Sequence, residues 1–165
     1  CSQTCLPTIK KSMKKLLSII VVSLLLSGSA NATMKGIFEV DLLVESLNKY
    51  AKECSLTRDS IVTTVKYIMQ NSKIKIKKAD AYLPTLYVKV GLIKSGNVCT
   101  ADIDISVESL DAKDPLGLEN YGFFLFYRNG VMTSGGSPSV FANSVINAVE
   151  EIMKDLVVEH HEDNS

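Results

Sequence analysis

The chain is poor in the residues that most often carry catalysis or bind metals. Its 165 residues include no tryptophan, four cysteines and two histidines, and both histidines, His160 and His161, lie close to the carboxyl end. A Ser–His–Asp triad and a histidine-rich zinc site each need histidine within the folded part of the chain. We therefore expect no catalytic residues, no metal ligands and no cofactor, and we expect that the protein is not an enzyme.

A long hydrophobic run is also absent. The apolar stretch Leu16–Leu26 is much shorter than the 20 or so residues of a membrane-spanning helix. It follows two lysines and leads into an Ala-Asn-Ala sequence that ends at Ala32. This pattern predicts a signal peptide over residues 13–32 that is cleaved after Ala32, with residues 1–12 an upstream extension. We expect the mature chain to be periplasmic or secreted, with no stable membrane span after cleavage.

No charge of one sign dominates the chain, which has 18 basic and 18 acidic residues. Lys10, Lys11, Lys14 and Lys15 precede position 33, so 14 basic residues face all 18 acidic ones in the remainder, a net charge of −4. This mild acidity argues against a nucleic-acid partner. The length of the remainder suits one domain, which we assign to residues 33–158, followed by a polar tail over 159–165.

Two of the four cysteines, Cys54 and Cys99, lie after the predicted cleavage point. An even number of thiols in an exported chain favours pairing. We therefore predict a Cys54–Cys99 disulfide. The alternative is two separate buried thiols.

Hydrophobic periodicity predicts an α+β fold. Alternation indicates strands at 37–43 and 73–78 and a long antiparallel hairpin of 83–94 with 98–110. A dense strand at 122–128 is followed by Asn129-Gly130, a hairpin signal that predicts a return strand at 131–133. Helical spacing begins after Thr57 and at Pro138. The economical arrangement is an antiparallel sheet of about five strands with two helices packed on one face.

Two segments suggest a contact surface. The aromatic run Phe123, Phe124, Phe126 and Tyr127, with Arg128, is a possible contact strip if one face of the sheet is open, because exposed aromatic clusters mark interfaces. Its alternative is ordinary core, which we favour. The lysines of 73–78 form a basic patch for an anionic surface or an edge strand protected by charge, and we favour the edge strand.

Two further segments have a chemical interpretation beside a structural one. Asp102, Asp104 and Glu108 suit a small hydrolase that uses surface carboxylates, but alternation already explains them as the solvated face of the hairpin. Ser134–Pro138 precedes a helix and is typical of an anion-binding loop, with Arg128 the nearest cation in sequence. We favour a loop with a helix cap there.

Several segments together resemble a loosely defined group of small exported bacterial proteins of unknown function. They are FEVDLLVESL, ECSLTRDSIVTTVKYIMQNSKIKI, LYVKVGLIKSGNVCTADIDISVESL and FANSVINAVEEIMKDLV. The resemblance implies an α+β domain with two helices and a single sheet, and no activity. The layout is also similar to the N-terminal domain of the Tol-system translocation protein, a similarity of fold that does not carry function.

These features together predict an exported, non-catalytic binding or accessory protein. The expected partner is a protein or another envelope component. A small periplasmic hydrolase and a secreted inhibitor or immunity-type protein are the alternatives.

Overall fold

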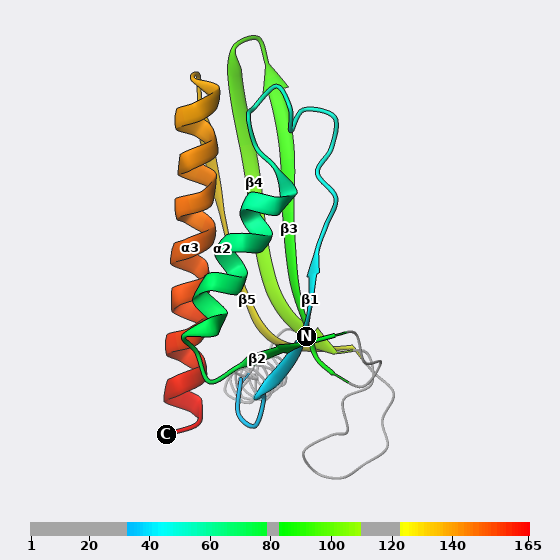
Figure 1. The fold of residues 1–165 in the computed structure, drawn as a ribbon, viewed down its shortest axis with the longest axis vertical. Coiled ribbons are helices and arrows are strands. Elements are labelled where there is room, and N and C mark those ends of the chain that lie inside the picture. The colour runs from blue at the N-terminus through cyan, green and yellow to red at the C-terminus, as the bar shows by residue number, and fades with distance from the viewer. Residues whose placement is uncertain (1–32, 79–82, 110–122) are drawn as a thin grey trace, which may run out of the picture. The chain divides into compact units, whose positions relative to one another are not determined.

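The computed structural model describes residues 33–78, 83–109 and 123–165, which belong to one compact unit. The predicted signal peptide and its predicted cleavage point lie outside the described residues. Figure 1 shows that the described residues form five strands and two helices. In chain order these are β1 (Glu39–Val44), α2 (Arg58–Gln70), β2 (Lys75–Lys77), β3 (Thr85–Ser95), β4 (Val98–Ser109), β5 (Phe124–Gly135) and α3 (Pro138–Asp163). The predicted α+β class is confirmed.

The strands form a single sheet in the order β2-β1-β3-β4-β5. β3 pairs with β4 and β4 with β5 in antiparallel fashion, so the sheet is mostly antiparallel, as predicted. β1 differs, because it runs parallel to both β2 and β3. The reason is that α2 carries the chain back along the sheet, so that β2 starts from the same end as β1.

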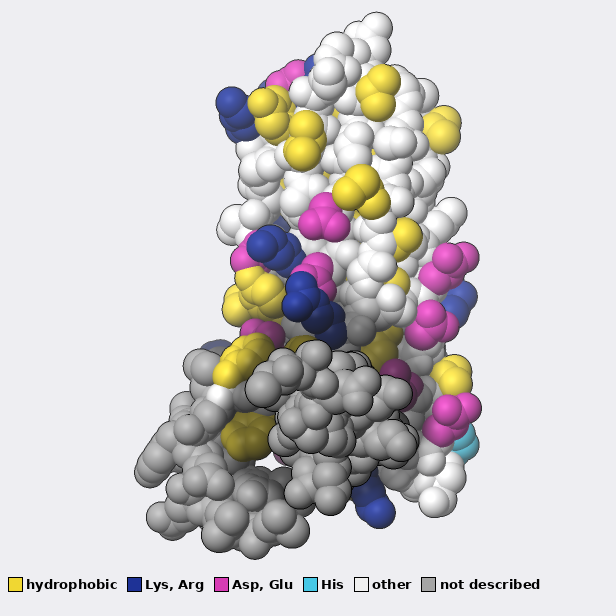
Figure 2. Space-filling model, turned by 180° about the vertical axis from the view of Figure 1, so that it is seen from behind, with side chains coloured by type: hydrophobic (Ala, Val, Ile, Leu, Met, Phe, Trp, Pro, Cys, Tyr) yellow, Lys and Arg dark blue, Asp and Glu magenta, His cyan; other side chains and the backbone are white. Residues whose placement is uncertain are grey.

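Both helices lie on the same face of the sheet (Figure 1). α3 packs against β4 and β5, and α2 packs against α3 on one side and against β1 and β2 on the other. The apolar positions of the central hairpin alternate, and those that face the helices are buried: Leu86, Val88, Val90, Leu92, Cys99, Ala101, Ile103, Ile105 and Val107. Figure 2 shows the opposite face, where hydrophobic and charged side chains are interspersed.

A disulfide joins Cys54 to Cys99, the pair predicted from the cysteine count. Both residues are buried, and their Cα atoms lie 6.0 Å apart. Cys54 lies in the turn that precedes α2, and Cys99 lies at the start of β4. The bond therefore ties the segment before α2 to the far end of the central hairpin, and it limits where α2 can begin.

The prediction of a hairpin at Asn129-Gly130 is wrong. β5 runs without interruption from Phe124 to Gly135 and pairs with β4 along this length. Within that ladder Asn129 pairs with Ile105, and Gly130 pairs with Asp104. The local turn preference is weaker than the ladder of hydrogen bonds that β4 offers to a continuous partner.

Residues 159–163 of the segment expected as a polar tail, 159–165, form the last turn of α3, and Asn164 is its C-cap residue. His160 is 2% exposed, and its Nε2 lies 2.7 Å from the carbonyl oxygen of Ile37. The side chain of Asp163 accepts a hydrogen bond of 2.6 Å from the backbone N–H of Met34. The last turn of α3 therefore holds the first described residues in place. The polarity of this segment predicts an exposed tail, but tertiary contacts bury part of it.

Candidate binding cleft

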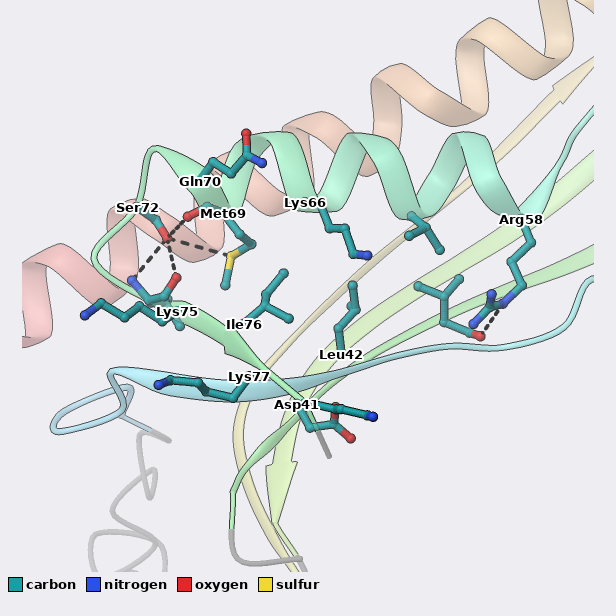
Figure 3. A pocket seen from close by; sticks show the side chains of 14 residues that line it. Asp41, Leu42, Arg58, Lys66, Met69, Gln70, Ser72, Lys75, Ile76 and Lys77 are labelled. Atoms are coloured by element: carbon teal, nitrogen blue, oxygen red, sulfur yellow. Dashed lines mark hydrogen bonds between the residues drawn. The ribbon is translucent and has the colours of Figure 1, made fainter. Parts of the chain in front are cut away.

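A cleft with a volume of about 930 Å³ lies between α2 and the β1–β2 edge of the sheet (Figure 3). We call it the α2–β2 cleft. Its walls come from α2, from the turn after it, and from β1 and β2. The lining residues are Asp41, Leu42, Val44, Arg58, Val62, Lys66, Met69, Gln70, Ser72, Ile74, Lys75, Ile76, Lys77 and Lys78.

One side of α2 forms a wall of the cleft. Ile61, Val65 and Met69 form the buried stripe of the helix, and Val62 and Lys66, one turn apart, lie beside that stripe. Figure 3 shows the Lys66 side chain directed from α2 into the space above Leu42 of β1. The helix stripe therefore fixes which residues of α2 line the cleft.

The turn after α2 closes one end of the cleft. The Ser72 hydroxyl lies 2.9 Å from the carbonyl oxygen of Met69 and 3.1 Å from that of Ile74. The same hydroxyl oxygen accepts a hydrogen bond of 3.1 Å from the Ile74 N–H. Ser72 thus links the last turn of α2 to Ile74, the residue before β2.

The cleft carries more positive charge than its neighbouring carboxylates balance. Lys77 is the one cleft cation that pairs with a described carboxylate, Glu39, at 3.3 Å. Arg58 donates from Nε to the carbonyl oxygen of Val44 at 2.9 Å. No ion pair within the described residues involves the remaining cations, Lys66, Lys75 and Lys78. Asp41 is the only acidic residue among the described residues that line the cleft.

The apolar part of the cleft is half-open to solvent. Leu42, Val62 and Ile76 are half-buried and pack on the core, while Val44, Met69 and Ile74 are buried beneath them. Aliphatic surface of this kind gains free energy when a ligand covers it. The cleft therefore combines an aliphatic floor with cationic rims.

The residues of the expected contact strip do not share one face. Phe123 is 61% exposed, whereas Tyr127 is 4% exposed and donates a hydrogen bond of 3.2 Å to the carbonyl oxygen of Ile152 in α3. Phe124 is half-buried, and Phe126, also half-buried, packs on the core. A register shift opposite Val107 and Glu108 interrupts the alternation here. The structure thus separates the run into core and surface residues.

Arg128, the last residue of that run, lies on the open face of the sheet and pairs with Asp104 of the neighbouring strand. Its Nε and Nη2 donate to the two carboxylate oxygens at 3.1 and 2.6 Å. These hydrogen bonds and the charge of Asp104 raise the pKa of Arg128. Arg128 is therefore engaged with the sheet and not with the Ser134–Pro138 loop.

The three carboxylates considered for hydrolysis lie on this open face. Asp104 is held by Arg128, and a Glu108 oxygen accepts a hydrogen bond of 3.3 Å from Ser106. The hollow beside them measures about 190 Å³, and Asp102 is not among its lining residues. Ligand sites typically measure about 300–1,000 Å³. The arrangement does not form a cleft in which these carboxylates converge.

At Ser134–Pro138 the structure shows the end of β5 and the start of α3. Ser137 is the N-cap residue and Pro138 the first residue of the helix, as predicted. The Ser137 side chain makes no capping hydrogen bond, and its carbonyl oxygen accepts from the Phe141 N–H at 2.8 Å. The favoured loop with a helix cap is therefore matched only in part, because β5 continues to Gly135 and the Ser137 hydroxyl does not cap the helix.

Sequence reasoning assigned β2 correctly as an edge strand. It did not predict that β2 lines the same cleft as Arg58 and Lys66 of α2. A signal was present, since positions 58–78 contain six basic residues, Arg58, Lys66, Lys73, Lys75, Lys77 and Lys78, and one acidic residue, Asp59. Charge counted over the helix and strand together, and not over each alone, would have indicated a basic site.

No protein-family model and no curated protein sequence matches the chain. Among solved structures, the chain is similar to a crystal structure of a minor lipoprotein from Acinetobacter baumannii, with 8% sequence identity and a TM-score of 0.39. The alignment covers 78% of this chain and 97% of that chain. The resemblance to small exported bacterial proteins stays a prediction, and we derive the function from the residues of this chain.

No helix of the described residues has both the length and the apolar character needed to cross a membrane. No group of three or more acidic, histidine or cysteine side chains in the same residues is placed to hold a metal ion. We base the function on the geometry and charge of the α2–β2 cleft.

Proposed function

We propose that this is an exported, non-catalytic binding protein, periplasmic or secreted, that takes an anionic ligand in the α2–β2 cleft. The observation that carries the proposal is the set of cleft cations without a described carboxylate partner, placed around an aliphatic floor. The ligand is a component of the envelope or of the medium around it.

Electrostatics supports an anion as the ligand. Like charges gathered on one side of a domain repel one another and destabilise the folded state, and a bound anion relieves this repulsion. Charges at the protein surface act over about 8 Å at physiological ionic strength. The attraction is therefore local to the cleft, although the chain after position 32 carries a net charge of −4.

The disulfide supports an exported location. Disulfides form and persist in oxidising compartments and are rare in the cytosol. The Cys54–Cys99 bond therefore fits the leader predicted at residues 13–32. The bond also joins the segment that precedes α2, one wall of the cleft, to the start of β4.

The test measures binding of the anionic fluorophore 8-anilinonaphthalene-1-sulfonate to the protein purified after export. We expect fluorescence to rise on binding, and the affinity to fall at high salt. Lys66→Glu should weaken binding about tenfold or more, equivalent to about 1.4 kcal/mol, because it reverses a charge directed into the cleft. Thermal unfolding of each variant establishes that it is folded.

Lys52→Glu is the matched control. Lys52 is exposed, lies in the turn before α2, and does not line the cleft. Lys52→Glu makes the same change in net charge as Lys66→Glu. It should leave the affinity for the fluorophore close to that of the unaltered protein. The proposal is overturned if both variants bind the fluorophore as tightly as the unaltered protein does.

A further inference from the structure

We infer that the ligand of the α2–β2 cleft is a single-chain anionic amphiphile, with its hydrocarbon chain on the aliphatic floor and its anionic head among the rim cations. The inference rests on the proposed function and names the chemical class of its ligand. Four features of the cleft carry it: its length, its floor, the absence of aromatic residues among its described lining residues, and the position of its cations.

The cleft is long, because it follows α2 from its first to its last residue. Arg58, Val62, Lys66 and Gln70, one per helical turn, all line it. At 1.5 Å per residue this row extends for about 18 Å. An elongated ligand fits such a cleft, and its volume of about 930 Å³ lies within the range of sites that hold organic ligands.

The floor is aliphatic along this length. β1 contributes Leu42 and Val44, β2 contributes Ile76, and α2 contributes Val62 and Met69. Methionine adapts to ligands of irregular shape. Burial of methylene groups on such a floor should strengthen binding by up to about fourfold for each group.

The lining contains no aromatic residue among the described residues that form it. Single-stranded nucleic acids bind to platforms of aromatic side chains on which their bases stack. A cleft whose described lining offers cations and aliphatic surface but no aromatic ring matches an acyl chain with a charged head better than it matches a nucleic acid.

The cations lie on both rims. α2 supplies Arg58 and Lys66, and β2 with the residue after it supplies Lys75, Lys77 and Lys78. Figure 3 shows Lys66 directed toward the floor, in the middle of the cleft between Gln70 and Arg58. An anionic head bound at Lys66 leaves the chain free to lie along the floor.

The experiment measures displacement of 8-anilinonaphthalene-1-sulfonate from the exported protein by carboxylates of increasing chain length, each below its critical micelle concentration. Butanoate, octanoate and dodecanoate are the probes. We expect octanoate to displace the fluorophore at a concentration at least tenfold lower than butanoate does, because four more methylene groups contact the floor. Octan-1-ol should need a concentration at least tenfold higher than octanoate, because it lacks the anionic head.

A pair of variants tests whether the hydrocarbon chain binds to the floor of the cleft or to another apolar surface. Val62→Thr places a hydroxyl on the floor at almost constant volume and should weaken displacement by dodecanoate severalfold. Val158→Thr makes the same change at a valine of α3 that is 56% exposed and does not line the cleft, and it should have no effect. Thermal unfolding checks that both variants are folded.

The inference is overturned if displacement does not depend on chain length, or if a short oligoglutamate displaces the fluorophore as effectively as dodecanoate does. In either case fluorophore binding that still depends on Lys66 leaves the proposed function intact. Fluorophore binding that is unaffected by Lys66→Glu removes the proposed function itself, so the two failures are distinguishable.

Discussion

At the scale of single residues, Tyr127 shows how burial changes the chemistry of a side chain. It comes from an aromatic run that suggested a contact strip, but it is 4% exposed and donates a hydrogen bond to the carbonyl oxygen of Ile152. Burial raises the pKa of Tyr127, because the phenolate would lose its hydration. The residue therefore links β5 to α3 only while it carries its proton.

This link predicts a dependence of stability on pH. Because the pKa of Tyr127 is higher in the folded than in the unfolded state, its contribution is fully present below about pH 10 and is lost as pH rises through the folded value. Tyr127→Phe should lower the free energy of unfolding at pH 7 by about 1 kcal/mol. It should also flatten the fall in stability above pH 10, as measured by chemical denaturation. An unchanged slope in this variant would contradict the assignment.

Gly130 is required for a different reason, namely the space around its Cα atom. A Cβ atom at this position would lie 2.7 Å from the carbonyl oxygen of Ile103 on β4. Gly130→Ala should therefore force β5 away from β4 and lower the free energy of unfolding by about 1–3 kcal/mol. Chemical denaturation measures the change.

Gly91→Ala is the control for this prediction. Gly91 also lies in a strand, but a Cβ atom there would meet its nearest neighbours, atoms of Asp102, at 3.9 Å, which is ordinary contact. This variant should be neutral or slightly stabilising, because alanine reduces the freedom of the unfolded chain. Equal losses at the two positions would mean that Gly130 has no special steric role.

At the scale of elements, α2 is the helix on which the cleft depends, and its first turn is capped. The Thr57 hydroxyl accepts a hydrogen bond of 3.1 Å from the Ser60 N–H, as the sequence predicts. Leu56 and Ile61, on either side of this cap, are both buried and form a hydrophobic staple. Local sequence therefore defines where α2 begins, before any contact with the sheet is made.

The cap gives a prediction that compares the two helices. Thr57→Ala should lower the free energy of unfolding by about 1 kcal/mol, because it removes the acceptor of the Ser60 N–H. Ser137→Ala at the N-cap of α3 should cost less, because that side chain makes no capping hydrogen bond. Thermal unfolding of both variants measures the difference, and a larger loss at Ser137 would contradict this account.

β2 shows one element with two roles. Its three residues form an edge of the sheet, and lysines on an edge deter pairing with other chains. The same lysines line the α2–β2 cleft. The two roles are compatible, because pairing of β2 with another chain would use its backbone, whereas the cleft uses its side chains.

At the scale of the whole molecule, the Cys54–Cys99 bond connects parts of the chain that are 45 residues apart. A loop of this length makes the bond worth roughly 4 kcal/mol in the loop-entropy description. Replacement of both cysteines by alanine should lower the free energy of unfolding by about that amount and loosen α2. The intact mass of the oxidised protein should increase by two hydrogens on reduction. Two thiols that react with an alkylating agent before reduction would contradict the bond.

Much of the fold followed from local pattern. The alternation of Leu86, Val88 and Val90 gave the central hairpin, and the spacing of Ile61, Val65 and Met69 gave α2. These predictions succeeded because burial of one face needs a regular period in each element. The predictions at Asn129-Gly130 and at His160 differed from the structure. At each position a contact distant in the sequence, with β4 or with Ile37, outweighs the local preference for a turn or an exposed tail.

The sequence indicated only part of the candidate site. Lys75 and Lys77 were noted as a basic strand, whereas Lys66 was one exposed position among several on a helix. Which exposed side of α2 faces the sheet edge depends on how the helix packs against α3 and β1. The tertiary packing therefore decides that α2 and β2 face each other across the cleft. No local sequence pattern predicts this arrangement.

The sequence by itself determined the class of the fold, the start of each helix, the central hairpin and the pair of cysteines that bond. These follow from interactions between near neighbours, from hydrophobic period and from a count of thiols. Only the tertiary structure decided the parallel placement of β1, the continuity of β5, the burial of His160 and the assembly of the α2–β2 cleft. Each of these depends on surfaces that meet across long separations in the chain, where packing and pairing outweigh local preference.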